Sequence, residues 1–294
     1  MLSNDQDKAA LNARIIRRKR TNTLFMILFA ASTFFGVVML ALLLIQILVQ
    51  GLGYLDWDFL TSYTSRKPEE SGIKSAMAGT LYMMAITAPL TFIIGVATAI
   101  YLEEYAKDTK ISRIIQVNIS NLAGVPSIVF GLLGLTVFVR LFGWGPSILS
   151  GALTMTLLVL PIIIVSAQEA IRTVPDSQRH ASFALGANRW QTVTRVVLPG
   201  ALPGILTGTI LAISRAIGET APLIVVGAVA FIASMPESLF DRFTVLPLQI
   251  FTWSSLPQPE FRKVAAAGII VLLVMLLGMN AFAIYLRNKY QKKK

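Results

Sequence analysis

The sequence contains no cysteine and a single histidine, His180. Disulfide frameworks, thiolate metal sites and thiol-based catalysis are therefore excluded, and so is a metal site built from several histidines. Charged residues are scarce as well, at 14% of the chain, against about a quarter in an average soluble protein. The chain also lacks the Gly-x-x-x-x-Gly-Lys-Ser/Thr phosphate loop, so it does not bind ATP in the usual way.

Apolar residues make up 55% of the 294 residues, and the mean hydropathy is +0.68. They gather in runs that are long enough to cross about 30 Å of hydrocarbon as helices. The first run is too long, and lacks the small-residue cleavage site, to be a removed signal peptide. The sequence therefore predicts an all-α integral membrane protein with six transmembrane helices, at Leu24–Val49, Ala76–Leu102, Ile114–Val139, Ile148–Val165, Ile205–Ala230 and Ala265–Leu286.

Lysine and arginine are distributed unevenly between the ends of these spans. If the N-terminus is cytoplasmic, 18 of the 26 basic residues lie on cytoplasmic segments and 7 on outer loops. The excess of positive charge predicts that both termini are cytoplasmic, and it explains the net charge of +11 without nucleic acid. The predicted organisation is a basic segment (1–22), a peripheral first transmembrane helix (23–50), an outer loop (51–75), a core (76–286) with a cytoplasmic loop (169–199), and a tail (287–294).

One cation and one anion, Arg215 and Glu219, lie in the fifth span. Each costs roughly 2.5–3.5 kcal/mol to insert at the bilayer centre, so such charges usually face a cavity or a partner. Their i,i+4 spacing puts both on one helix face, and Pro222 leaves the carbonyl of Gly218 without its helical donor, which predicts a kink. Two interpretations remain open: a transport site for a polar solute, or an ion pair that only locks helix packing.

Small residues and prolines recur in the other spans, where close helix packing explains most of them. The exception is the stretch Gly124–Ser127, because Ser127 and a backbone carbonyl freed by Pro126 can line a path. In the last outer loop, the apolar stretch Phe243–Trp253 is expected to lie on the surface or to dock a partner.

The cytoplasmic loop 169–199 carries ordered turn signals. Asp176 or Ser177 can cap a short helix over Gln178–Leu185, and Gly186 follows where a helix needs a left-handed residue to stop. Asn188 with Gln191 then forms a capping box for a second helix. The pattern predicts helix, glycine hinge, helix: either a knob that docks on another protein or an amphipathic hairpin at the membrane surface.

This loop resembles the EAA loop of binding-protein-dependent ABC importer permeases. The nine-residue spacing from Gly186 to the apolar residues before Leu198-Pro199 matches that pattern, whereas His180 stands where the family has glutamate. The resemblance implies a type I importer fold (MetI-like) and contact with an ATPase through the residues His180, Ala181, Ser182, Gly186, Leu198 and Pro199.

Three further stretches, Ala99–Ala106, Gly124–Gly131 and Arg215–Leu223, resemble the PstA family of phosphate importer permeases. That resemblance implies a bacterial inner-membrane subunit of an ATP-driven phosphate importer, not itself an enzyme and with no cofactor of its own. It implies three kinds of partner: a second, PstC-like permease in a heterodimer, two PstB-like ATPase subunits, and an extracytoplasmic PstS-like phosphate-binding protein. On this interpretation the substrate path includes Arg215, Glu219, Thr220 and Ser127.

Several alternatives remain. The chain resembles the sister permease PstC in much of this pattern, and a sulfate or molybdate permease of the same superfamily is a second possibility. A secondary transporter would need no ATPase, but the sequence shows no internal repeat. A membrane enzyme is disfavoured by the lack of cysteine, the single histidine and the absence of clustered intramembrane acids.

Overall fold

The computed structural model describes residues 2–228, 231–232 and 234–291, and those residues form helices and connecting segments without a strand. They include five helices long and apolar enough to cross a membrane, and a bent pair that makes a sixth if its halves are one span. The all-α membrane fold predicted from the sequence is therefore confirmed. The chain divides into two compact units, Met1–Gln50 and Gly51–Lys294.

The described residues of the first unit all belong to the helix α1 (Leu2–Gly51), which is continuous over 50 residues. At 1.5 Å per residue it is about 75 Å long, more than twice the thickness of the hydrocarbon layer. Its apolar side chains from Leu24 to Val49 are largely exposed, as expected for a helix that faces lipid. The basic residues of the N-terminal segment precede this apolar part on the same helix.

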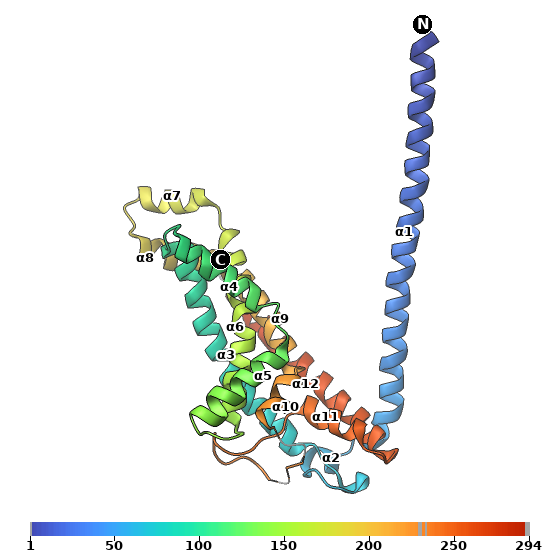
Figure 1. Cartoon of the computed structure of the whole chain (residues 1–294), viewed down its shortest axis with the longest axis vertical. Helices are drawn as coiled ribbons and strands as arrows, with labels where there is room; N and C mark the ends of the chain where they lie inside the picture. The colour runs from blue at the N-terminus through green and yellow to red at the C-terminus, as the bar shows by residue number, and fades with distance from the viewer. Residues whose placement is uncertain (1, 229–230, 233, 292–294) are drawn as a thin grey trace. The chain divides into compact units, whose positions relative to one another are not determined.

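The second unit is a bundle of long helices with short elements at its two ends (Figure 1). Helices α7 and α8 lie at one end of the bundle and α2 at the other. In chain order its elements are η1 (Leu52–Tyr54), α2 (Trp57–Thr61), η2 (Pro68–Glu70), α3 (Lys74–Ile100), η3 (Tyr101–Tyr105), α4 (Lys110–Leu122), α5 (Ser127–Gly134), η4 (Leu135–Leu141), α6 (Ile148–Arg172), α7 (Asp176–Ala184), α8 (Arg189–Thr192), η5 (Val193–Val197), α9 (Leu198–Ile217), α10 (Ala221–Val226), α11 (Leu246–Ser255) and α12 (Glu260–Gln291).

The third predicted span is not one straight helix. Helix α4 and the segment Ser127–Leu141 meet at an angle of 104°. Pro126 has no N–H to donate, and its ring disfavours helical backbone at Val125, so the helix ends here. Two turn hydrogen bonds close the corner, from the Gly124 and Val125 amides to the carbonyls of Asn121 and Leu122. The span predicted at Ile114–Val139 is therefore made of two helical segments joined at a corner, where a single helix was expected.

The fifth predicted span also differs from expectation. Its helix begins earlier, because α8, η5 and α9 form one helical run from Arg189 to Ile217. The run ends at Gly218, and α10 starts three residues later with Pro222 in its first turn. The kink expected at Pro222 is thus a complete break of the helix. The predicted end of the span, at Ala230, lies outside the described residues, as do Lys292, Lys293 and Lys294 of the tail.

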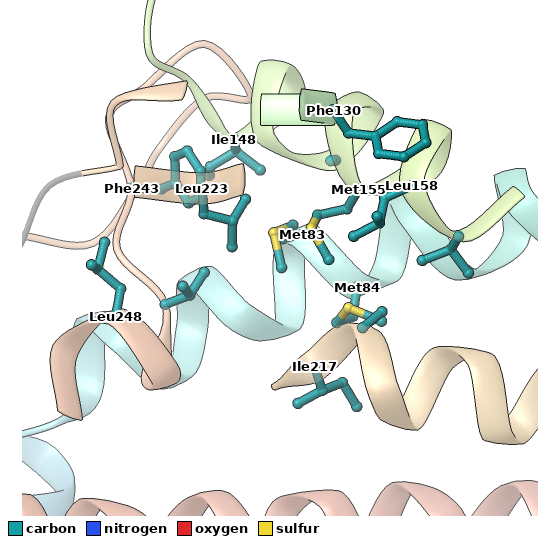
Figure 2. Packing of buried hydrophobic residues seen from close by; sticks show 14 of the residues in the cluster. Met83, Met84, Phe130, Ile148, Met155, Leu158, Ile217, Leu223, Phe243 and Leu248 are labelled. Carbon is teal, nitrogen blue, oxygen red and sulfur yellow. The ribbon is translucent and has the colours of Figure 1, made fainter. Parts of the chain in front are cut away.

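The main core lies where α3, α6, α9 and α10 meet. Met83 and Met84 from α3 converge there with Met155 from α6 and Ile217 from α9 (Figure 2). Methionine is unbranched and fills irregular gaps between helices well. Helix α6 is the element against which α3 and both helices flanking the break, α9 and α10, are packed.

The apolar stretch Phe243–Trp253 lies in the core, and the expectation that it lies on the surface was wrong. Phe243 packs in the main core, and Trp253 packs with Phe59 of α2 in a second cluster. The Thr80 hydroxyl of α3 accepts a hydrogen bond from the Leu246 amide and so fixes the start of α11. Burying these large side chains removes more apolar surface from water than a surface position would.

Candidate functional site

The charged pair of the fifth span lies at the helix break. Arg215 is in the last turn of α9, and Glu219 follows in the break. Their closest atoms, Arg215 Nε and Glu219 Oε1, are 3.5 Å apart. The Arg215 side chain is 65% exposed and the Glu219 side chain 19% exposed. The cation therefore keeps most of its surface accessible while an anion beside it offsets part of its charge.

Helix α10 packs closely on α5 beside this break. At Gly131 in α5, a Cβ atom would come within 2.8 Å of Pro222 Cα, so only glycine lets the two backbones approach this closely. Ser127 lies one helical turn before Gly131, on the same face of α5. Thr220 precedes α10 and is partly buried. Ser127 thus starts α5, and Thr220, which follows Glu219 in the chain, directly precedes α10.

A polar contact between α9 and α12 adjoins the pair and was missed from the sequence. The Ser214 hydroxyl donates to Asn280 Oδ1 of α12 over 2.5 Å and also approaches the Ile210 carbonyl at 2.7 Å. Asn280 was the signal available in the sequence, because an amide inside an otherwise apolar span needs a partner. The contact fixes the helix immediately before Arg215.

The cytoplasmic loop forms helix, glycine hinge and helix as its turn signals predict, but the expected cap at Asp176 or Ser177 was wrong, because α7 begins at Asp176 directly after Pro175 and has no side-chain cap. Helix α7 ends at Ala184, and Gly186 follows with φ +83°, a left-handed conformation in which a side chain is strained. The capping box is complete: the backbone N–H of Gln191 donates to Asn188 Oδ1 at 2.8 Å, and the backbone N–H of Asn188 donates to Gln191 Oε1 at 2.9 Å. The loop is therefore an ordered hairpin of two helices.

The six residues that the resemblance assigns to ATPase contact fall into two groups. His180, Ala181 and Gly186 are exposed. Ser182 is partly buried, with its hydroxyl 2.9 Å from that of Thr192, so it ties α7 to α8. Leu198 and Pro199 start α9, and Leu198 packs against a buried cluster of α3, α6 and α9. The hairpin thus has an outer surface and a buried base.

Large apolar side chains lie on the outer surface of the hairpin. Leu185 is 89% exposed, and Trp190 and Phe183 are exposed to a smaller extent. Leu185 also lines a shallow hollow of about 330 Å³. It is lined by Ser182, Leu185, Gly186, Ala187, Gln191, Arg195 and Val196. Clustered exposed apolar side chains beside a hollow are typical of a protein-docking surface. Leu185 was not singled out in the sequence, although its place just before the hinge glycine was a usable signal.

Ion pairs at the base of the hairpin were also missed. Glu103 pairs with Arg172, and Glu104 pairs with Arg179, so the end of α3 is joined to α6 and α7. The adjacent acids directly after an apolar span were visible in the sequence, but their partners lie 69 and 75 residues away. Among the residues that the structure describes, no three His, Asp or Glu side chains come together to hold a metal ion.

The fold is that of a membrane protein with several spans, and comparison with known proteins gives its family. Residues 91–291 match the family model described as binding-protein-dependent transport system inner membrane component. The chain belongs to this family: it is a multi-pass inner-membrane permease subunit of an ABC importer, and such subunits are not catalytic.

Curated relatives match over nearly the whole chain. The probable ABC transporter permease protein YqgI of Bacillus subtilis is 32% identical over 95% of this chain and 99% of its own length. The phosphate transport system permease protein PstA of Mycobacterium leprae is 34% identical over 91% of this chain and 88% of its own. PstA of Haemophilus influenzae is 28% identical over 98% and 100%.

Solved structures confirm the fold. A bacterial alginate ABC transporter, solved with an alginate-bound periplasmic protein, matches with a TM-score of 0.63 at 16% identity, over 90% of this chain and 93% of that one. The inward-facing MetNI methionine transporter matches with a TM-score of 0.56 at 19% identity, over 72% and 92%. The type I, MetI-like fold expected from the loop is therefore confirmed.

Proposed function

We propose that this chain is the PstA-type permease subunit of an inorganic phosphate importer. The observation that carries the proposal is the exposed guanidinium of Arg215, which lies beside Glu219 at a helix break inside an apolar span. Broken helices that present backbone and charge inside the membrane are the usual substrate sites of transporters. The PstA relatives, similar over nine-tenths of the chain or more, support phosphate as the substrate.

Arg215 is chemically suited to this anion. A guanidinium binds two oxygens of one phosphate in a planar fork, which a lysine does not reproduce. An unopposed arginine in a water-poor path would hold the anion too tightly for release. Glu219 at 3.5 Å offsets that charge, and its carboxylate can accept a hydrogen bond from a protonated phosphate oxygen. Fully ionised sulfate has no such proton, so Glu219 also provides a means of discrimination.

The proposed assembly contains a PstC-like permease, two PstB-like ATPase subunits and a PstS-like binding protein outside the membrane. The outer surface of the hairpin, with His180, Ala181 and Gly186, docks on the ATPase. Leu198 and Pro199 transmit the displacement of the hairpin to α9, because α8, η5 and α9 form one helical run. Movement at the hairpin then reaches the break at Gly218 along a single helix.

The test is uptake of labelled phosphate by the purified complex in liposomes. The Arg215→Ala variant is compared with Arg140→Ala, a matched control at an exposed arginine outside the site. Both variants must co-purify with the other subunits. The proposal expects Arg215→Ala alone to lose uptake; normal phosphate uptake by that variant would remove Arg215 from the path. Competition by unlabelled sulfate or molybdate decides between phosphate and the other anions.

A further inference from the structure

The π-helical turn η3 at the cytoplasmic end of α3 joins three other elements. Its first acid, Glu103, forms a two-pronged ion pair with Arg172 of α6. Arg172 Nε lies 3.0 Å from Glu103 Oε2, and Arg172 Nη2 lies 2.8 Å from Glu103 Oε1. Gln168 Nε2 donates to the same Oε1 at 2.9 Å. Paired parallel hydrogen bonds of this kind fix geometry as well as charge, so η3 and the end of α6 are held in one orientation.

Arg179 of α7 uses all five of its N–H groups. Nε and Nη2 donate to Glu104 Oε1 at 3.1 and 2.9 Å. Nη1 donates to the Val174 carbonyl at 2.6 Å and to Asp176 Oδ1 at 3.0 Å, and Nη2 donates to the Ile171 carbonyl at 3.1 Å. The side chains of Arg179 and Glu104 are only 16% and 10% exposed. This arginine therefore binds α3, the end of α6 and the start of α7 together.

The second arm of the hairpin is joined to the same turn. The guanidinium of Arg189 in α8 lies 5.8 Å from the ring centre of Tyr105, within the range of a cation–π contact. The hydroxyls of Ser182 and Thr192 link the two arms to each other. Both arms of the hairpin are therefore attached to η3 by side chains, although only the second arm continues directly into a long helix, α9.

We propose that Glu104 and Arg179, supported by Glu103 and Arg172, are positioning residues that clamp the hairpin to α3, so that the hairpin, α3 and α6 move as one body. The proposal rests on the proposed function only in taking the hairpin as the ATPase docking site. It adds a second route by which movement driven by the ATPase reaches the substrate path. The first route is the covalent connection from the hairpin into α9. The second runs through the ion pairs into α3, whose Met83 and Met84 pack in the same core cluster as Ile217 near the break.

The clamp predicts a specific defect in variants that lack one of its residues. Removing one partner of a buried ion pair leaves the other charge uncompensated, and here it also frees the hairpin from α3. ATP is then still hydrolysed, because the docking surface is intact, but less of the resulting movement is transmitted to the substrate path. The expected effect is a lower ratio of substrate transported to ATP hydrolysed, by about tenfold, which corresponds to 1.4 kcal/mol of lost coupling.

This chain has no cysteine of its own, which permits a direct experiment with introduced thiols. The double variant Glu104→Cys/Arg179→Cys is purified in the full complex and measured in liposomes before and after treatment with a short bifunctional thiol cross-linker. We expect uncoupled hydrolysis before treatment and restored coupling after it, because the cross-link replaces the ion pair. The matched control is Asp108→Cys/Arg113→Cys, which replaces a solvent-exposed ion pair of the same region and should stay coupled in both states.

Three results would overturn the proposal. The first is normal coupling of the untreated double variant, and the second is failure of the cross-linked, assembled complex to recover. If the double variant does not assemble, Glu104→Gln decides, since it keeps shape and acceptor and removes only the charge; normal coupling of Glu104→Gln is the third. If the unmodified complex takes up no phosphate, the proposed function fails instead, and the clamp is then judged by stimulation of ATP hydrolysis by the binding protein.

Discussion

Ser214 directly precedes Arg215 in α9, and its hydroxyl lies 2.5 Å from the amide oxygen of Asn280 in α12. Two spans that are far apart in the sequence are thus joined by a polar contact at the level of the charged break. Because hydrogen bonds between membrane helices contribute about 0.6 kcal/mol on average, this contact serves to orient α9 more than to stabilise the bundle. Orientation is what the accessible guanidinium of Arg215 requires.

Replacing Asn280 by alanine should therefore impair transport more than stability. We expect a small loss of thermal stability in detergent, on the order of 1 kcal/mol, and a several-fold decrease in uptake as α9 gains freedom to rotate. Asn118→Ala is the control, since the Asn118 amide bonds only a carbonyl of its own helix at an exposed position. Equal uptake by the two variants would contradict the orienting role.

Arginine-to-lysine exchange tests the geometry at position 215. Arg215→Ala should abolish phosphate uptake, and Arg215→Lys should retain only a small fraction of it, because lysine carries the charge without the planar fork. Initial rates of labelled uptake, with assembly checked by co-purification, give the measurement. Full activity of Arg215→Lys would show that charge alone is needed.

Neutralising Glu219 should affect selectivity. The Glu219→Gln side chain keeps its shape but loses the charge that opposes Arg215, so phosphate should be released more slowly and sulfate should compete better. Uptake of labelled phosphate in the presence of increasing sulfate is the measurement, with the unmodified complex as the reference. Unchanged rate and unchanged competition together would leave Glu219 as a purely structural partner.

Gly186 should be sensitive to any side chain. A residue with a Cβ at φ +83° costs about 1–2 kcal/mol, which shifts the angle between α7 and α8. Gly186→Val should uncouple ATP hydrolysis from transport, and Gly186→Ala should do so more weakly. Gly278→Ala is the control, because a Cβ at Gly278 meets no atom within 4 Å. If Gly186→Val changes neither hydrolysis nor transport, the hairpin is not the docking site.

Gly131→Ala tests whether the packing of α5 on α10 sets the substrate path. The added Cβ meets the backbone of Pro222 at 2.8 Å, so α10 must move, at a cost of about 1–3 kcal/mol. We expect reduced uptake in a protein that still assembles. Gly124→Ala is the matched control on the same span, since its Cβ would come no closer than 3.5 Å to a neighbouring atom. The uptake of both variants and their thermal stability in detergent are compared.

The features that follow from the sequence are those set by residues close together in the chain. The capping box of Asn188 and Gln191 and the left-handed Gly186 were predicted because such bonds join residues three or four apart. The interruption at Pro222 was predicted for the same reason, although as a kink. The bend before Ser127 was missed: Pro126 was noticed for its freed carbonyl, but the chain direction after a proline depends on what the next helix packs against.

The sequence by itself determined that this chain crosses a membrane as helices, with basic ends on the cytoplasmic side and two opposite charges in its fifth span. Those properties follow from composition and short-range backbone geometry, which no distant residue alters. Only the tertiary structure decided that Phe243 and Trp253 are buried, that Arg179 is paired with Glu104, and that Arg215 stays accessible. Each of these depends on contacts between residues far apart in the chain, and pattern and spacing along one segment carry no record of such contacts.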